Sequence, residues 1–370
     1  MRATRAVIHL DRFRRNLAAI RERTGPGIRI CLPVKAGAYG HGAPRIAAEG
    51  LAAGASYLAV ATVREGAELR DAGIGAPVLL LSQALPEEIP DMVKYALVPL
   101  ISDREFVGAC SRVAGEAGVR LPVHLKIDTG MGRLGCGPGE APDLAAHIAS
   151  LESLEYRGTA THLAAADSTE EGDLRFTEAQ IRRFNAALEG IRARGVDPGI
   201  VHAANSGALI LHRAAWFDMV RPGILSYGYN PVPGDPFRVE PVMDLVSRVV
   251  FIKELEKGEP LSYGGAWRAP RDTRVATLPI GYGDGLHRRL SGMDWPVIIR
   301  GRAYPIVGRI CMDQCMVDLG PGTEVRRWDE ALIFGGEGVP GAADMAAKLG
   351  TIPYEIVCNL NRRVERVYPP

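Results

Sequence analysis

Between residues 28 and 229 the chain alternates short apolar runs with longer segments in which apolar residues recur every three or four positions. The longer segments, such as TVREGAELRDAG, often open on Ser, Thr or Asp, which cap helix N-termini. The apolar runs, rich in β-branched residues, lie at 28–34, 56–61, 77–82, 95–101, 122–127, 156–163, 199–204 and 218–224. These eight strand-then-helix repeats predict an α/β fold with an N-terminal (β/α)8 TIM-type barrel, and a doubly wound open sheet is the alternative.

The pattern changes after NPVPGDP, at 230–236, where three prolines and one glycine predict a linker or a sharp turn. The later runs, such as LVSRVVFIKEL and WPVIIRGRAYPIVGRI, are separated by Gly and Pro turns, and ADMAAKLG has helical spacing. We therefore expect a barrel domain over residues 1–233 and a mostly β C-terminal domain over residues 234–370.

Composition limits the class of protein. The 370 residues are 47% hydrophobic and 24% charged, and 44 basic against 43 acidic side chains leave a net charge of +1. This length allows two domains with cores of their own, and the charge balance argues against nucleic acid or an acidic membrane surface as partner. No run approaches the ~20 apolar residues of a membrane span, and the N-terminal segment lacks a signal-peptide core, so we expect a cytoplasmic protein.

The cysteines do not form a recognisable motif. The six of them, at positions 31, 110, 136, 311, 315 and 358, lack the spacing of a disulfide scaffold or of a C-x-x-C zinc site. Cys311 and Cys315 have a spacing that suits a metal on a helix, but their segment has the pattern of a strand. We expect reduced thiols and no metal.

In barrels of this type functional side chains gather where strands end. Strand one ends at Lys35, strand six at His162 and strand eight at Arg221. The other polar or glycine-rich positions at strand ends are Lys126, Asp128, Arg133, Asn205, Ser206, Gly223 and Ile224. The residues after strands seven and eight suit a phosphate, because glycines and a helix start present backbone N–H groups. Alone, NSG is also a helix cap and RPG a turn.

Lys35 adds an amine to this candidate phosphate site. A lysine that closes a buried strand is desolvated, loses its proton readily and is able to form a Schiff base. Pyridoxal 5′-phosphate carries both the aldehyde and the phosphate that these residues would bind. The alternative is a salt-bridged lysine at the start of a loop.

Eight motifs together resemble the alanine racemase family: PVKAGAYGHG, KIDTGMGRLG, HAANSGA, RPGI, SYGGAW, IGYGDG, GRICMDQ and PYEIVCNLNRRVERVY. They follow the family order and extend over essentially the whole chain. The resemblance implies a pyridoxal-phosphate racemase that interconverts L- and D-alanine and supplies D-alanine for peptidoglycan synthesis. It also implies a homodimer with composite active sites.

The resemblance further implies a role for each matching residue. Lys35, joined to the cofactor, would act as the base for D-alanine, and Tyr263 of the other subunit as the base for L-alanine. Arg133 and the backbone N–H of Met312 would bind the substrate carboxylate, and Tyr282 would narrow the entrance. The cofactor would be held by Lys35, Tyr39, His162, Asn205, Ser206, Arg221, Gly223, Ile224 and Tyr354.

Some positions qualify this assignment. Gly37 stands where the family has Asn, and Gly283 stands where it has Ala. Lys126 occupies a position that some members carry as a carbamylated lysine beside Arg133, and the sequence leaves that modification open. Arg221, expected at the pyridine nitrogen, keeps its proton, which makes the ring a weaker electron sink and limits transamination.

Three other functions stay open at this point. A pyridoxal-phosphate homeostasis protein resembles the barrel but lacks the second domain and its Tyr263. A decarboxylase of the same fold type typically has an acidic group at the pyridine nitrogen, where this chain has Arg221. Within the racemases, serine or a longer amino acid is the alternative substrate, and the tyrosine-lined entrance favours alanine.

Overall fold

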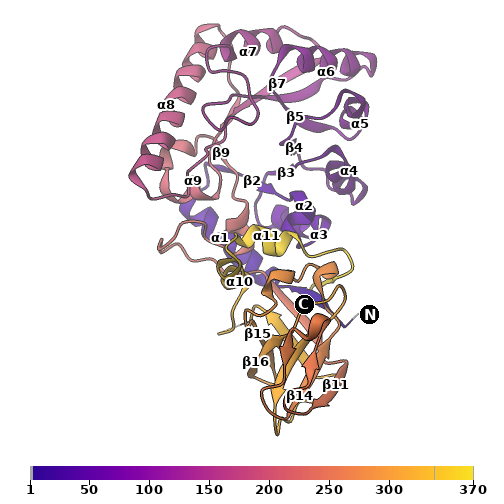
Figure 1. The fold of residues 1–370 in the computed structure, drawn as a ribbon. Coiled ribbons are helices and arrows are strands. Elements are labelled where there is room, and N and C mark those ends of the chain that lie inside the picture. The colour runs from indigo at the N-terminus through magenta and orange to yellow at the C-terminus, as the bar shows by residue number, and fades with distance from the viewer. Residues whose placement is uncertain (1–2, 337, 370) are drawn as a thin grey trace. The chain divides into compact units, whose positions relative to one another are not determined.

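The computed structural model describes residues 3–336 and 338–369, which divide into two compact units. The barrel unit comprises residues 13–38 and 42–240. The β-rich unit comprises residues 39–41 and the described parts of 1–12 and 241–370. Figure 1 shows the barrel unit in indigo to pink, and most of the β-rich unit in orange and yellow. In this division the barrel unit extends to residue 240, and the described residues before Phe13 lie in the β-rich unit.

Eight parallel strands form the barrel, in the order β8-β7-β6-β5-β4-β3-β2-β9. Their bounds are β2 (Arg29–Pro33), β3 (Tyr57–Val60), β4 (Val78–Leu80), β5 (Leu97–Ile101), β6 (Leu121–Lys126), β7 (Leu154–Ala160), β8 (Ile200–His202) and β9 (Met219–Val220). The ends of β8 and β9 are joined by backbone bonds from Asp218 N to Val201 O, at 3.0 Å, and from Arg221 N to Ala204 O, at 2.8 Å. The sheet is therefore nearly closed. The predicted barrel is confirmed, and the open doubly wound sheet is wrong.

Helices follow the strands, and local sequence explains where several of them begin. Thr62 and Glu65 form a capping box at α4, Asp103 accepts from Phe106 N at 2.8 Å at α6, and Asn205 caps α9. The bounds are α1 (Leu10–Thr24), α2 (Lys35–Tyr39), α3 (Ala43–Ala52), α4 (Val63–Asp71), α5 (Ile89–Lys94), α6 (Arg104–Glu116), α7 (Ala141–Ala149), α8 (Glu171–Ala193) and α9 (Ser206–Leu211).

The β-rich unit is built on a nine-stranded sheet with the order β11-β14-β17-β16-β15-β18-β10-β1-β19. Its strands are β1 (Arg5–Ile8), β10 (Met243–Arg248), β11 (Phe251–Leu255), β14 (Thr273–Leu278), β15 (Pro296–Ile299), β16 (Arg302–Val307), β17 (Cys315–Gly320), β18 (Glu330–Phe334) and β19 (Glu365–Val367). Strands β12 (Pro260–Leu261) and β13 (Trp267–Arg268) form a separate hairpin, and the helices are α10 (Ala342–Leu349) and α11 (Pro353–Cys358). The predicted mostly β C-terminal domain is confirmed.

Strand β1 explains why the N-terminal residues belong to this sheet. It pairs antiparallel with β10 and parallel with β19, so segments from the two ends of the chain meet there. A sequence pattern shows that a segment is a strand but not which distant strand it pairs with.

Each unit has an apolar core. The barrel interior contains a buried cluster that includes Cys31, Leu79 and Met219, and the β-rich unit contains one that includes Leu255 and Val307. All six cysteines lie within the described residues and are free thiols. Among the described residues no group of three or more His, Cys, Asp or Glu side chains is placed to hold a metal ion. None of the described helices combines the length and the hydropathy of a membrane span.

Candidate active site

Lys35 begins a turn with an unusual backbone. Strand β2 ends two residues earlier, and after Lys35 the residues Ala36, Gly37 and Ala38 have φ values of 52°, 61° and 55°. Left-handed residues normally occur singly, because the Cβ of an L-residue crowds the next carbonyl oxygen. Glu65 holds this turn, since its Oε1 accepts from Ala36 N at 2.7 Å. Strain of this kind is typical of functional sites, and here it directly follows the candidate nucleophile.

Arg221 is a buried cation at the barrel rim, which we define as the region where strands β2 to β9 end. Its guanidinium donates to His202 Nδ1 at 2.7 Å, to Thr161 O at 2.9 Å and to Ala203 O at 3.0 Å. It also lies 3.3 Å from Nδ1 of His162. Burial lowers the pKa of Arg221 to about 10, so it is still charged at neutral pH. Carbonyls and imidazoles hold this charge, and no carboxylate among the described residues forms an ion pair with it.

Two further basic side chains, Lys126 and His162, lie close enough to Arg221 for its charge to lower their pKa values. The pKa of Lys126 is lowered to about 7 by burial and by the charge of Arg221, and its Nζ donates to Ile127 O at 3.1 Å. The pKa of His162 is lowered well below its ordinary value by burial and then by Arg221, with smaller effects of Lys126, Arg133 and Lys35. His162 is therefore neutral at pH 7, and it lies near four basic side chains, of which Lys126 is only partly protonated at that pH. This excess of positive charge suits an anionic ligand.

The loops after β8 and β9 meet as the sequence predicts. Asn205 Oδ1 accepts from Ala208 N at 3.0 Å, and Ser206 Oγ accepts from Leu225 N at 3.3 Å. The second bond joins the start of α9 to the 3-10 turn η3 (Ile224–Tyr227), which follows Gly223. Asn205 is thus a helix cap, which is the purely structural role that the sequence analysis offered for NSG. It also lies in the group of loops that suits a phosphate.

The remaining predicted residues belong to the β-rich unit. The rings of Tyr39 and Tyr354 are 5.9 Å apart, and Tyr39 is buried. Gly283 N donates to Met312 O at 2.9 Å, which joins the loop that carries Tyr282 to the loop that carries Met312. Tyr282, Met312 and Tyr263 are all exposed, and Tyr263 has an exposed fraction of 69%. The structure thus divides the predicted residues between the two units.

Sequence reasoning missed several residues that support these two sets. His124 is a histidine inside the apolar run of β6, and His202 opens the HAANSGA motif, so a polar residue in a buried strand was the available signal. Glu65, which holds the turn after Lys35, carries no signal beyond its capping box. Arg363 donates to both Asp284, at 3.0 Å, and Asp313, at 2.7 Å. The positions of these three residues along the sequence do not indicate that they meet.

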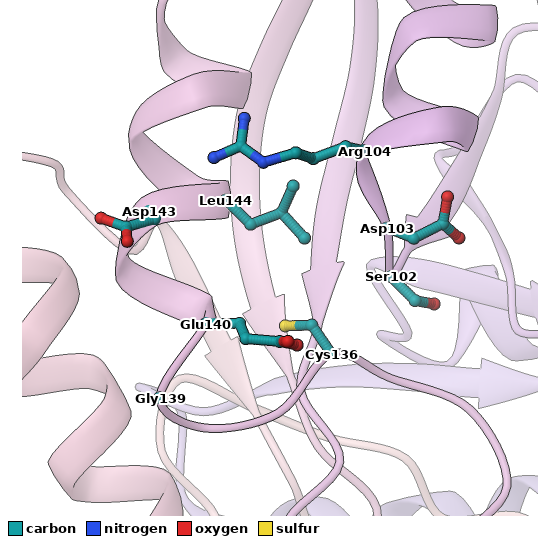
Figure 2. A pocket seen from close by; sticks show the side chains of 8 residues that line it. All are labelled: Ser102, Asp103, Arg104, Cys136, Gly139, Glu140, Asp143 and Leu144. Carbon is teal, nitrogen blue, oxygen red and sulfur yellow. The ribbon is translucent and has the colours of Figure 1, made fainter.

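A separate cavity of about 370 Å³ lies in the barrel unit near the end of β5 and the start of α7. Figure 2 shows Arg104 and Leu144 on one side of it and Cys136 with Glu140 on the other. Its carboxylates serve local structure, because Glu140 accepts from Gly137 N at 3.1 Å and Asp143 pairs with Arg194. None of its lining residues is among the predicted cofactor or substrate residues.

Two protein-family models match this chain. Residues 8–231 match the model of the alanine racemase N-terminal domain, and residues 242–368 match that of the alanine racemase C-terminal domain. The chain belongs to the alanine racemase family. Since both domains match, the resemblance seen in the motifs is confirmed, and membership of the alanine racemase family excludes the homeostasis protein and the decarboxylase.

Three relatives illustrate the likeness. The alanine racemase of Treponema denticola is 50% identical over 375 residues, which cover 100% of this chain and 98% of that protein. The structure of alanine racemase from Clostridium difficile 630 has a TM-score of 0.94 at 35% identity and covers 100% of this chain and 96% of that one. The alanine racemase of Bartonella henselae with covalently bound pyridoxal phosphate has a TM-score of 0.87 at 26% identity, with 100% of both chains covered.

Proposed function

We propose that this chain interconverts L- and D-alanine with pyridoxal 5′-phosphate as its cofactor. The observation that carries the proposal is the barrel rim. There Lys35 follows strand β2, and the buried Arg221, which forms no ion pair with a carboxylate of the described residues, lies near the basic groups of Lys126 and His162. Family membership supports the reaction. The D-alanine produced would serve peptidoglycan synthesis, and we propose a cytoplasmic location on the same ground.

The donor set fits this cofactor. The hydrogen bonds of Arg221 to the described residues all come from Nη1 and Nη2, which leaves the Nε–H for a ring nitrogen. The phosphate would be held by Tyr39, Ser206, Gly223, Ile224 and Tyr354, with Asn205 close by, and His162 would lie against the ring. When bound, the cofactor withdraws electrons from the α-carbon of an attached amino acid and so acidifies its proton.

Two bases would complete the reaction. Inversion requires a proton to leave one face of the α-carbon and another to arrive on the opposite face. Lys35 would serve one face. Tyr263 would serve the other, and its exposure on the β-rich unit supports a site completed by a second copy of the chain. We therefore propose a homodimer in which each site takes Lys35 from one subunit and Tyr263 from the other.

Substrate selection would involve both units. Arg133 and the backbone N–H of Met312 would bind the substrate carboxylate, and Tyr282 with Tyr354 would narrow the entrance. We propose alanine as the preferred substrate because a narrow entrance admits a methyl side chain more readily than a longer one. Incubation with single enantiomers of alanine, serine, lysine and arginine, followed by chiral chromatography, tests this preference.

The attachment of the cofactor is tested at Lys35. Borohydride reduction of the purified protein and peptide mapping should place the pyridoxyl group on Lys35, and Lys35→Ala should lose the covalent link. A pyridoxyl group on another lysine would show that the assigned site is wrong.

The second base is tested by isotope exchange. Tyr263→Phe should lose racemisation by several orders of magnitude and keep its bound cofactor, because the phenol would act on the α-proton and not on the phosphate. The variant should still exchange the α-hydrogen of D-alanine in D₂O through Lys35. Racemisation at a near-normal rate, or exchange of L-alanine alone, contradicts the assignment.

A further inference from the structure

Three buried polar side chains form a line through the barrel interior. Arg221 Nη1 lies 2.7 Å from Nδ1 of His202, and Nε2 of His202 lies 2.8 Å from Nδ1 of His124. The exposed fractions are 6% for Arg221 and 0% for both histidines. His124 lies on β6, two residues before Lys126, and His202 is the last residue of β8.

Chemistry fixes where the protons of this chain lie. A guanidinium only donates, so Nδ1 of His202 accepts from Arg221 and its proton is on Nε2. That Nε2–H then donates to Nδ1 of His124, whose own proton is on Nε2. Both rings are neutral, since burial and the charge of Arg221 lower the pKa of His202, and burial followed by the charges of Arg157 and Arg221 lowers that of His124 to about 3.

Packing keeps the His124 ring in this orientation. A Cβ placed on Gly158 would be 2.5 Å from the ring of His124, so glycine at this position of β7 leaves the space that the ring fills. The ring of Tyr57 lies 6.3 Å away at an interplanar angle of 62°. Nε2 of His124 is buried and has no hydrogen-bond partner among the described residues, so the chain of hydrogen bonds ends there and runs in one direction only.

We propose that His124 is a positioning residue for Arg221, acting through the tautomer of His202. With Nδ1 of His124 as acceptor, His202 keeps its proton on Nε2 and presents a lone pair to Arg221. Without that acceptor, the Nδ1–H tautomer of His202 becomes competitive, and this tautomer repels the guanidinium. The proton order stands on the geometry alone, whereas its effect on the cofactor rests on the proposed function.

This arrangement has a consequence for the charge of Arg221. A carboxylate in place of His202 would hold the guanidinium equally well and would neutralise it. Neutral imidazole holds it and leaves its full charge toward the group that its Nε–H faces. His124 thus helps keep a cation, rather than an ion pair, at the position proposed for the pyridine nitrogen.

Two variants separate hydrogen bonding from packing. In His124→Asn the amide oxygen occupies about the place of Nδ1 and still accepts from His202, whereas His124→Leu keeps an apolar volume and has no acceptor. Val201→Ala, a buried packing change on the same strand as His202, is the control for lost stability.

The first readout is the tautomer of His202 in the apoprotein, measured from two-bond ¹H–¹⁵N couplings after ¹⁵N-histidine labelling. We expect a proton on Nε2 in the wild type, in His124→Asn and in Val201→Ala, and a mixture of tautomers in His124→Leu. A proton on Nδ1 of His202 in the wild type, or an unchanged tautomer in the leucine variant, would overturn the proposal.

The second readout tests the effect on the cofactor. His124→Leu should bind pyridoxal phosphate about five-fold more weakly, a change in affinity that corresponds to the free energy of one net hydrogen bond. His124→Asn should bind it with the wild-type affinity. The leucine variant should also form pyridoxamine phosphate more often per turnover, because Arg221 controls the ring nitrogen less well. Equal affinity and equal by-product formation in the two variants would overturn this part, even if the tautomer shift is seen.

Discussion

At the scale of the single residue, burial changes the protonation of Lys126. A lysine with a pKa of about 7 is half deprotonated at neutral pH, and the neutral amine is the form that reacts with CO₂. The carbamylation that the sequence left open thus has a suitable amine in the structure. Its neighbour Arg133 is exposed and contributes less to the shift than Arg221 does.

The same pKa predicts a pH dependence of stability. Between pH 7 and the ordinary lysine pKa of 10.5, the unfolded chain holds a proton that the folded chain lacks. The contribution of Lys126 to the free energy of unfolding should therefore rise as pH increases through this window and stay constant below it. Urea unfolding of wild type and Lys126→Met in CO₂-depleted buffer, at pH ~7 and pH ~9.5, measures the difference. A wild type that loses stability relative to the variant as pH rises would contradict the assignment.

Gly37 illustrates a second effect at this scale. Its φ is 61°, a value that glycine adopts freely and that asparagine tolerates better than other side chains. A Cβ at this position would have no atom within 4 Å, so space does not oppose a side chain. The departure from the family residue thus preserves the turn beside Lys35.

Two substitutions at Gly37 test this explanation. Gly37→Asn should change the free energy of unfolding by less than ~0.5 kcal/mol, because asparagine visits the left-handed region readily. Gly37→Val should destabilise the protein by about 1–2 kcal/mol through backbone strain. Thermal unfolding of both variants measures the difference, and equal stability of the two would count against backbone strain as the cause.

At the scale of elements, hydrogen bonds join two loops of the β-rich unit to each other. The loop of Tyr282 and the loop of Met312 share backbone bonds, from Tyr282 N to Cys311 O at 3.0 Å and from Gly283 N to Met312 O at 2.9 Å. Arg363 joins both, through the fully buried Asp284 and through Asp313. A Cβ on Gly283 would lie 3.0 Å from Met312 O, so an alanine here would require the Met312 loop to move by a few tenths of an ångström.

Removing this link should weaken substrate binding. Arg363→Gln is expected to raise the KM for alanine about five- to ten-fold with a smaller change in kcat, because the backbone N–H of Met312 would be less well placed for the carboxylate. Steady-state kinetics in both directions measure the two constants. Arg362→Gln, at the adjacent exposed arginine, is the matched control. A change in kcat alone would show that Arg363 acts elsewhere.

At the scale of the whole molecule, the predicted residues divide between two units. Lys35 and Arg221 lie in the barrel unit, whereas Tyr263 and Met312 lie in the β-rich unit and are exposed. A tyrosine that acts as a base needs a reacting group beside it, and Tyr263 has an exposed fraction of 69%. The proposed homodimer would supply that group from the second subunit.

Mixing of inactive subunits tests the shared site. Neither Lys35→Ala nor Tyr263→Phe should racemise alanine alone, but a mixed dimer would contain one site with both bases intact. Activity should therefore appear after mixing, reach about half of the wild-type value per mixed dimer, and follow subunit exchange measured with labelled chains. Complete exchange without activity would place Tyr263 in the site of its own barrel.

Local pattern was sufficient for the eight barrel strands and for the order of the motifs, but it did not predict strand β1 or helix α11. The alternation of eight apolar runs with helical segments predicted every barrel strand, because burial on both faces of a parallel strand requires continuous apolar residues. Lys35, His162 and Arg221 were recognisable because a charged or polar residue at the end of such a run is costly to bury without a function.

The pairing of distant strands and the environment of the buried side chains were decided only by the tertiary structure. Strand β1 joins the C-terminal sheet because its partners β10 and β19 lie far along the sequence, and no local pattern specifies a distant partner. The low pKa of Lys126 and the proton order from Arg221 to His124 depend on burial and on distances between residues of different strands. Desolvation and directed hydrogen bonds exist only once those strands are brought together, which is why the residue types were readable in the sequence and their protonation states were not.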